Sequence, residues 1–341
     1  MKLPSAFERY LDAIEAEIRS LLAERNLPLY DMMRYHLGWV DEHGRPLQSS
    51  TGKGLRPTLC LLACEATCDN YQNALPAAAS VELLHNFSLI QDDIQDDDRE
   101  RRHRPTVWSI WGKPQAINAA TAMHVLANLA LSRLEEHSTP FHKQQRAQSL
   151  LYQCCLRLIE GQYWDISYEK RLDIDVDDYL NMIERKTAEL IACSLELGAL
   201  LGTDNEHLIA GFRNFGRNLG LAFQIRDDIM GIWGAEKDTG KPVASDIRRK
   251  KKSFPIVYAL ENTAGGAKAE LMDIYKGDDI DGNGVDKVLM ILEAIGAKAQ
   301  AQRVADRYCE QALKDIEGMA ISPQASASLR EMARFLVERE F

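Results

Sequence analysis

The stretch ELLHNFSLIQDDIQD, residues 82–96, joins an apolar segment to a group of carboxylates. The apolar segment is helix-like, with no strand-like alternation, which predicts a helix. Asp92 and Asp96 are four residues apart, so they share one face at the end of this helix. Carboxylates grouped beside an apolar segment repel each other and lose hydration, so they do not serve stability. We therefore expect a binding site there.

A second segment repeats this arrangement later in the chain. In LAFQIRDDIMG, residues 221–231, Asp227 and Asp228 follow an apolar run. Two such helix ends, brought together, would offer several oxygen ligands to hard cations such as Mg²⁺. Because Mg²⁺ usually shares its coordination with substrate phosphate, the two segments predict a phosphate-bearing substrate between two helices.

Nearly the whole chain has helical periodicity, and alternating β-branched runs are missing. Residues 177–201 show it best, because they begin with aspartates and stop at Gly202. We predict one all-α domain over residues 1–341. The other predicted helices cover 75–94, 116–134, 148–166, 206–232 and 285–316, and the predicted loops lie near 42–54, 98–115, 167–176 and 234–246.

Composition narrows the functional classes. The 341 residues are 45% hydrophobic and 27% charged, which is enough for a large core. A net charge of −10 argues against general nucleic-acid binding, although local bases can still hold an anionic substrate. The charged N-terminus lacks a signal-peptide core and no apolar run is long enough to span a bilayer. We therefore expect a cytoplasmic protein that does not cross the membrane.

Two patterns that resemble metal sites have simpler interpretations. Cys60, Cys64 and Cys68 recur every four residues, but no histidine or fourth cysteine completes a zinc site nearby, so we interpret them as buried thiols. Residues 278–286 begin like a calcium-binding loop. Met290 stands where the bidentate glutamate should be, which favours a turn between helices.

Three basic segments could bind an anionic substrate. GKGLRP (52–57) places Lys53 and Arg56 at the start of a helix, where free N–H groups favour anions. Two arginines of RRHRPT (101–106) follow the first aspartates, and arginine pairs its donors with phosphate oxygens. RRKKK (248–252) fits a nucleic-acid patch or a lid over the metal site. Its position after the second aspartates favours the lid.

Seven segments together resemble the polyprenyl synthetase family of trans-isoprenyl diphosphate synthases, in the family's order and spacing. They are GKGLRP (52–57), ELLHNFSLIQDDIQD (82–96), RRHRPT (101–106), EGQYWDI (160–166), RKTAEL (185–190), FQIRDDIMG (223–231) and GKPVASDIRRKKKSFP (240–255). The resemblance implies the isoprenoid synthase fold, a bundle of long antiparallel helices around a central cavity, usually as a homodimer. It also implies a reaction that joins isopentenyl diphosphate to an allylic diphosphate, head to tail, with Mg²⁺.

The resemblance further implies roles for single residues. About three Mg²⁺ ions would be held by the aspartates of the two segments, with substrate phosphate completing their coordination; these aspartates are Asp92, Asp93, Asp96, Asp227 and Asp228. The allylic diphosphate would contact Arg101, Lys186, Lys241 and Lys251. The isopentenyl diphosphate would contact Lys53, Arg56, His85 and Arg102. The allylic cation formed in catalysis would face Gln224 and the backbone of Lys186 and Thr187.

Product length is expected to depend on the side chains below the first aspartates, Phe87 and Ser88. Phe87 precedes Asp92 by about 7.5 Å along a helix, so its ring would close the bottom of the cavity. No insertion interrupts the aspartate segment. These features resemble the archaeal type of geranylgeranyl synthase and favour a C20 product, with C15 and C25 as alternatives.

Three positions depart from the usual family pattern. Gly231 stands where many members have a last aspartate, Gln91 replaces a frequent histidine, and Ala120-Thr121 replaces a common Gly-Asp. Two rival functions are a terpene cyclase of the same fold and a non-catalytic subunit of a heteromeric synthase. The intact isopentenyl diphosphate set argues against the first, and the retained aspartates argue against the second.

Overall fold

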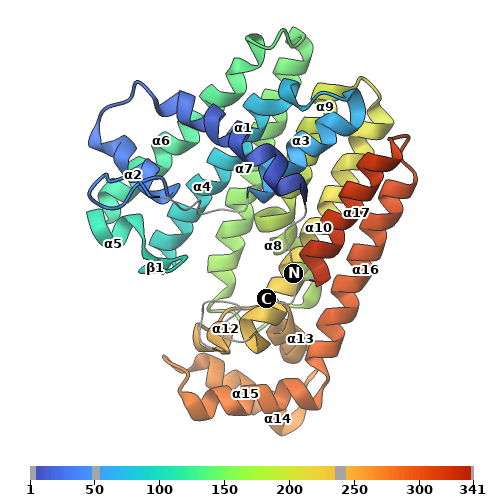
Figure 1. The fold of residues 1–341 in the computed structure, drawn as a ribbon. Helices are drawn as coiled ribbons and strands as arrows, with labels where there is room; N and C mark the ends of the chain where they lie inside the picture. Colours follow the sequence, from blue (N-terminus) through green and yellow to red (C-terminus); the bar gives the residue numbers. More distant parts are fainter. Residues whose placement is uncertain (1–4, 48–53, 235–242, 339–341) are drawn as a thin grey trace.

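The computed structural model describes residues 5–47, 54–234 and 243–338, which are almost entirely helical (Figure 1). The α-helices are α1 (Ser5–Leu22), α2 (Pro28–His36), α3 (Leu55–Cys68), α4 (Leu75–Gln95), α5 (Val107–Trp111), α6 (Lys113–Ser132), α7 (Phe141–Tyr168), α8 (Val176–Ile183), α9 (Glu189–Gly202), α10 (Glu206–Trp233), α12 (Ser245–Arg248), α13 (Phe254–Asn262), α14 (Gly265–Lys276), α15 (Gly282–Ala294), α16 (Ala297–Glu317) and α17 (Pro323–Glu338). Shorter turns are the 3₁₀ segments η1 (Tyr71–Ala74) and η2 (Arg133–Glu135) and the π-helical turn η3 (Glu184–Ala188).

Helix α9 lies in the core of the bundle. Its residues from Glu189 to Leu201 are all buried, and it packs against α3, α4, α7 and α10. A helix that is buried around its whole circumference must be surrounded in this way, and the two buried acids of α9, Glu189 and Glu196, form ion pairs with Arg213. Burying one leucine side chain favours folding by roughly 1.5–3 kcal/mol, so α9 fixes its neighbours firmly. Two of those neighbours, α4 and α10, carry the aspartate segments.

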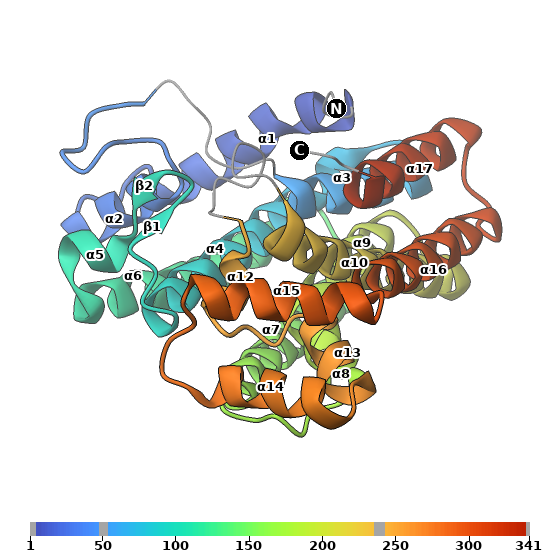
Figure 2. The same ribbon diagram turned by 90° about the horizontal axis from the view of Figure 1, so that it is seen from below.

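A smaller group of helices covers one end of the bundle. Residues of α12, α13, α14 and α15 share a separate hydrophobic cluster with Ile232 near the end of α10. Figure 1 shows α14 and α15 at the end far from α1 and α3, and Figure 2 views the molecule from that end, with α15 across the middle. Helices α16 and α17 run beside α10. The C-terminal ends of α4 and α10 therefore lie between the main core and this group. No described helix is both long enough and apolar enough to cross a bilayer.

The predicted helices are confirmed with three corrections. The segment 177–201 is interrupted by η3, whose π-helical turn inserts an extra residue. The segment 285–316 breaks at Gly296, whose φ of +65° ends the first helix. The predicted loop 98–115 contains α5, the start of α6, and a hairpin of β1 (Glu100–Arg101) with β2 (Arg104–Pro105).

Two glycines bring neighbouring helices close to η3. A Cβ on Gly161 of α7 would lie 2.3 Å from the backbone nitrogen of Lys186, and one on Gly220 of α10 would lie 2.5 Å from the Cα of Ala188. Side chains do not approach backbone so closely, so only glycine fits at either position. The EGQYWDI and RKTAEL segments, distant in sequence, thus form one contact.

The two simpler interpretations of metal-like patterns are both consistent with the structure. Cys60 and Cys64 are buried in α3, and Cys68 is half-buried. Asp281 caps α15 by accepting a hydrogen bond from the backbone nitrogen of Gly284 at 2.7 Å. Residues 278–286 are therefore a turn between α14 and α15 that runs into the latter.

Candidate active site

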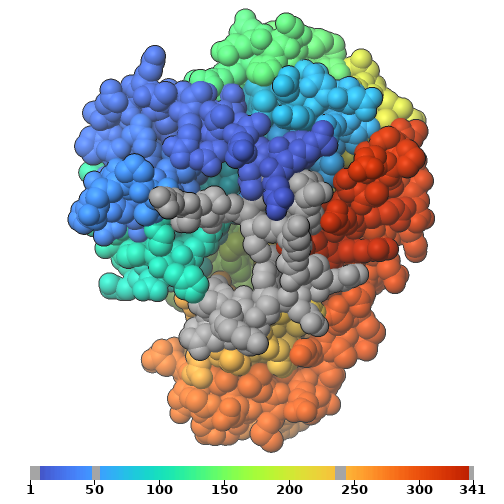
Figure 3. All heavy atoms as spheres, viewed as in Figure 1, coloured from blue at the N-terminus to red at the C-terminus, as the bar shows by residue number. Residues whose placement is uncertain are grey.

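Both aspartate segments open into one cavity of about 290 Å³. Residues of α4, α7, α8, η3, α10 and α12 surround it. Figure 3 shows a recess beside the teal segment near residue 100, with green atoms visible deep inside it. The lining residues are Asp92, Asp96, Asp98, Arg101, Asp165, Tyr179, Met182, Ile183, Lys186, Thr187, Gln224, Asp227, Asp228, Asp246, Lys251, Lys252 and Ser253.

The carboxylates of the first aspartate segment have two kinds of surroundings. Asp92 faces the cavity, and burial raises its pKa although the Lys186 charge opposes the rise. Asp96 lies 3.8 Å from the Nζ of Lys251. Asp93 does not line the cavity: it is buried and accepts a hydrogen bond from the Nε of Arg101 at 2.7 Å. Burial raises the pKa of Asp93 to about 6.

In the second segment both aspartates, Asp227 and Asp228, line the cavity, but Asp228 is also held by protein donors. Asp228 accepts hydrogen bonds from the hydroxyl of Tyr179, from Gln224 Nε2 at 2.9 Å and from the backbone nitrogen of Phe254 at 2.7 Å. Burial raises the pKa of Asp228 to about 7, and the charge of Asp246 adds to the rise. Three donors already occupy this carboxylate, so it ties α10 to α8 and α13.

The η3 turn places Lys186 and Thr187 on the cavity wall. The Nζ of Lys186 forms an ion pair with Asp165 of α7. Burial works against the charge of Asp165, but the ammonium of Lys186 holds the pKa of this carboxyl below its usual value. Thr187 Oγ1 donates to Gln224 Oε1 at 2.8 Å. The three residues expected near the allylic cation, Lys186, Thr187 and Gln224, are therefore together.

The basic run 248–252 is held at several points. Arg249 forms an ion pair with Asp98 at 2.7 Å, and Lys250 donates to the carbonyls of Gly277 and Asp278 after α14. Lys251 faces Asp96 in the cavity. A flat nucleic-acid patch would present these charges outward, whereas here several point to protein oxygens.

Lys252 belongs to this run but is buried. Its Nζ donates to the carbonyl of Glu169 at 2.8 Å and lies 4.9 Å from the ring centre of Tyr275. Burial lowers the pKa of Lys252 to about 8. This side chain anchors the run to α7 and α14, which supports the lid interpretation over the patch.

The residues expected to hold isopentenyl diphosphate are partly described. Arg56 Nη1 lies 3.1 Å from His85 Nε2. Burial and the charges of Arg56 and Arg102 hold the pKa of His85 well below its usual range. Arginine only donates, so Nε2 accepts and the proton of the neutral ring is on Nδ1. Arg102 lines a separate hollow of about 170 Å³ with Glu82, Asn86 and Gly54.

The residues expected to limit product length lie outside the polar cavity. Phe87 is buried on α4, and its ring centre lies 5.1 Å from that of His124 on α6. His124 Nε2 in turn lies 3.5 Å from the thiol of Cys155 on α7. Ser88 Oγ donates to the carbonyl of His85 at 2.8 Å, so its hydroxyl is turned to the helix backbone.

Several expected residues lie outside the described ranges, and several lining residues were not predicted. Lys53 and Lys241 belong to the first group. Asp165, Tyr179 and Asp246 belong to the second. Asp165 and Asp246 lie within family-like segments, which could have drawn attention to them. Tyr179 carries no such signal, because its role depends on the packing of α8 against α10.

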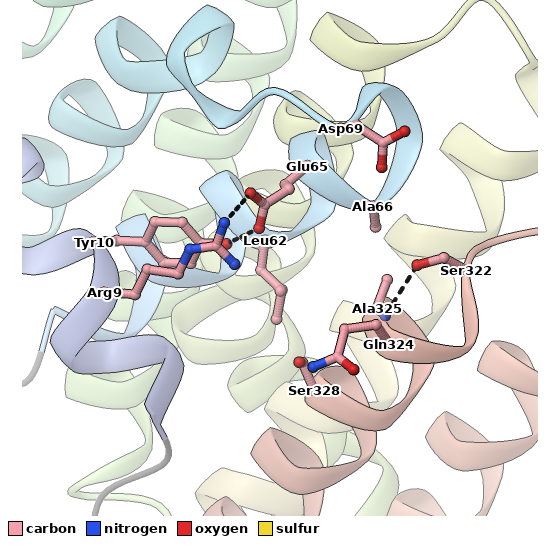
Figure 4. A pocket seen from close by; sticks show the side chains of 10 residues that line it. All are labelled: Arg9, Tyr10, Leu62, Glu65, Ala66, Asp69, Ser322, Gln324, Ala325 and Ser328. Atoms are coloured by element: carbon pink, nitrogen blue, oxygen red, sulfur yellow. Dashed lines mark hydrogen bonds and ion pairs between the residues drawn. The ribbon is translucent and has the colours of Figure 1, made fainter.

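A larger pocket, of about 390 Å³, contains none of the expected residues. It lies between α1, α3 and α17 (Figure 4). Arg9 and Tyr10 both donate to Glu65 there, so the charges of Arg9 and Glu65 are paired within the protein. The polar cavity between α4 and α10 remains the candidate active site.

Comparison with known proteins identifies the family. The polyprenyl synthetase family model matches residues 38–292. The (2E,6E)-farnesyl diphosphate synthase of Mycobacterium tuberculosis strain H37Rv is 36% identical over 332 residues, 96% of this chain and 91% of the relative. The geranylgeranyl diphosphate synthase of the same strain is 38% identical over 301 residues, 88% and 85% of the two chains.

A solved structure agrees with the sequence comparisons. The crystal structure of polyprenyl synthetase from Streptomyces coelicolor A3(2) superposes with a TM-score of 0.90 at 34% identity, and the match covers 98% of this chain and 99% of that one. The chain therefore belongs to the polyprenyl synthetase family.

Proposed function

We propose that this chain condenses isopentenyl diphosphate with allylic diphosphates and releases geranylgeranyl diphosphate (C20). Its family and its relatives make it a short-chain prenyl diphosphate synthase. The C20 product, the residue roles and the action of residues 1–341 as one domain are our proposal. The observation that carries it is the single cavity shared by both aspartate segments, Lys186 and Gln224.

Asp92, Asp96 and Asp227 are proposed to bind Mg²⁺, on which this family generally depends. The donors fit, since hard cations prefer carboxylate oxygens. The raised pKa of Asp92 marks a buried charge that a cation would stabilise. Bound Mg²⁺ would neutralise charge on a leaving diphosphate. Substrate oxygens are expected to complete the coordination of about three ions, because Mg²⁺ is usually bound by one or two carboxylates together with substrate phosphate. Asp93 and Asp228 are proposed as positioning residues, because both are held by protein donors.

The bases around the cavity would assist ionisation of the allylic substrate. Arg101, Lys186 and Lys251 would donate to the departing diphosphate as its C–O bond breaks, which stabilises the growing negative charge. The amide oxygen of Gln224 and the η3 backbone would face the allylic cation. The isopentenyl double bond then attacks this cation, and the released diphosphate takes the proton lost from the product.

Isopentenyl diphosphate is proposed to bind Arg56, His85 and Arg102, together with Lys53. Neutral His85 would present its Nδ1–H as a donor, while the two guanidinium groups would pair with phosphate oxygens. A terpene cyclase has no need of such a second diphosphate site. The arrangement therefore favours chain elongation over cyclisation.

A homodimer is proposed from an exposed apolar stripe. On α7, exposed apolar side chains recur in alternating steps of four and three, the spacing of helices that pack against each other; they are Tyr152, Leu156, Ile159, Tyr163 and Ile166. Exposed Val125 and Leu129 extend it on α6, which a hydrogen bond of 2.9 Å between Gln148 and Asn128 joins to α7.

The decisive experiment incubates purified protein with Mg²⁺, labelled isopentenyl diphosphate and C5, C10 or C15 allylic diphosphate in turn. Geranylgeranyl diphosphate as the main product is the expected result. A main product of C15 or C25 would overturn the length assignment alone. Cyclised hydrocarbon, or turnover only with a second subunit, would overturn the proposed function.

A further inference from the structure

A side chain at position 231 on α10 would meet the carboxylate of Asp246. A Cβ on Gly231 would lie 2.0 Å from Oδ2 of Asp246 and 2.5 Å from its Cγ. The carboxylate of Asp246 therefore lies where a side chain at 231 would begin. This position is also where the sequence departs from the family pattern by lacking an aspartate.

Asp246 is brought there by α12, the short helix after the second aspartate segment. The Ser245 hydroxyl lies 3.4 Å from the carbonyl of Gly231, within reach for a hydrogen bond, so α12 lies directly on the end of α10. The backbone nitrogen of Lys251 donates to the carbonyl of Asp246 at 2.9 Å. The same turn thus sets the positions of Asp246 and of Lys251 in the cavity.

Asp246 also lies among the groups of the second aspartate segment. It lines the cavity together with Asp227 and Asp228. Its negative charge adds to the rise of the pKa of Asp228, as expected for two neighbouring carboxylates. Asp228 accepts hydrogen bonds from three protein donors, and Asp246 beside it is half-buried.

We propose that Asp246 supplies, from α12, the carboxylate that position 231 lacks, and that Gly231 is required because its missing side chain admits Asp246. Asp227 and Asp246 then form the α10 side of the Mg²⁺–diphosphate site. This inference rests on the proposed function and deepens it. It has a counterintuitive consequence: restoring the family's aspartate at position 231 weakens the site, because the new side chain displaces Asp246.

The test moves a carboxylate from position 246 to position 231. Wild type, Gly231→Asp, Asp246→Gly and the double variant are titrated with inorganic diphosphate in the presence of Mg²⁺, and the affinity is measured by calorimetry. Each single change is expected to weaken binding roughly ten- to hundredfold, as for groups that support a metal site. The double variant is expected to regain most of that loss, since removing the Asp246 side chain makes room for the new carboxylate.

Two outcomes overturn the inference. The first is that Gly231→Asp binds diphosphate as tightly as wild type. The second is that the fold loss of affinity in the double variant equals the product of the fold losses in the two single variants, as for independent sites. Gly282→Ala is the control, because a Cβ there meets no atom within 4 Å; it should bind like wild type. Circular dichroism checks that each variant is folded. If wild type binds Mg²⁺ and diphosphate but forms no prenyl product, the proposed function fails while the binding comparison still decides the role of Asp246.

Discussion

At the scale of single residues, the product-length assignment depends on one buried ring contact. Phe87 lies against His124, and His124 lies against the Cys155 thiol, so three helices meet at this point. Such a contact closes space more firmly than one side chain alone, because each group is supported by the next. Removing the phenyl ring should therefore open the space towards His124.

Phe87→Ala is expected to shift the main product from C20 to longer chains, because the floor of the cavity would drop. Chain lengths of the dephosphorylated products, separated by reversed-phase chromatography, measure the change. Phe212→Ala is the control: Phe212 is also buried, but on α10. Both changes should cost about 3–5 kcal/mol of stability, yet only the first should alter chain length. Unchanged product lengths from Phe87→Ala would contradict the proposal that the Phe87 ring closes the bottom of the cavity.

The sequence predicts those site residues whose residue type alone indicates their chemistry. The paired aspartates, Lys186 and Gln224 were expected near one substrate, and they line one cavity. Asp93 and Asp228 could not be separated from their neighbours, because the choice depends on Arg101 and Tyr179 approaching from other elements. Spacing along a helix defines a face, but it does not show what covers that face.

At the scale of elements, the η3 turn depends on close contacts with α7 and α10. The absence of side chains at Gly161 and Gly220 lets both helices reach its backbone. The turn carries Lys186 and Thr187, so these contacts position two cavity residues without touching the substrate. Helical periodicity predicted one continuous helix here, because a π-helical turn leaves no signature in the apolar pattern.

Gly161→Ala is expected to lower kcat by up to about a hundredfold, since small displacements of positioning groups have effects of this size. The new methyl group would meet the Lys186 backbone, so η3 must shift. Steady-state kinetics with the allylic substrate measures the effect. Gly266→Ala provides the matched control, because its Cβ meets nothing within 4 Å. Normal kcat in Gly161→Ala would show that the turn tolerates displacement.

At the scale of the whole molecule, the exposed apolar stripe on α6 and α7 stands out by its regular spacing, whereas exposed apolar residues such as Leu27 and Met290 lie elsewhere. Tyr163 is 68% exposed and Leu156 is 58% exposed, although both lie on a helix whose other faces enter the core. Apolar side chains at such regular spacing are typical of a surface that another chain covers. Most of the stripe lies on α7, which also contributes Asp165 to the cavity, so assembly would also steady one wall of the site.

The double variant Leu156→Glu/Tyr163→Glu is expected to convert a dimer to a monomer, because burying the new charges without partners is costly. Light scattering after size-exclusion chromatography gives the mass. Met290→Glu is the control, since Met290 is 69% exposed on α15, away from the stripe. A wild-type chain that already runs as a monomer would refute the dimer.

The all-α class and the bounds of most long helices could be predicted because apolar periodicity directly reflects burial. The arrangement of α12 could not, since Asp246 reaches α10 only through tertiary packing. The break at Gly296 and the small hairpin near residue 100 were missed for a related reason: both depend on one or two residues with positive φ.

The π-helical turn also limits how this chain can change over evolutionary time. A π-helical turn holds one residue more than an α-helical turn, so deleting one residue of 184–188 would turn η3 into an ordinary α-helical turn and keep the relative orientation of α8 and α9. The deletion would still remove the turn that places Lys186 and Thr187 on the cavity wall. Because Glu189 to Leu201 are buried on every side, α9 cannot shift to compensate. Descendants of this sequence that lose one residue here would therefore keep the fold and change the site.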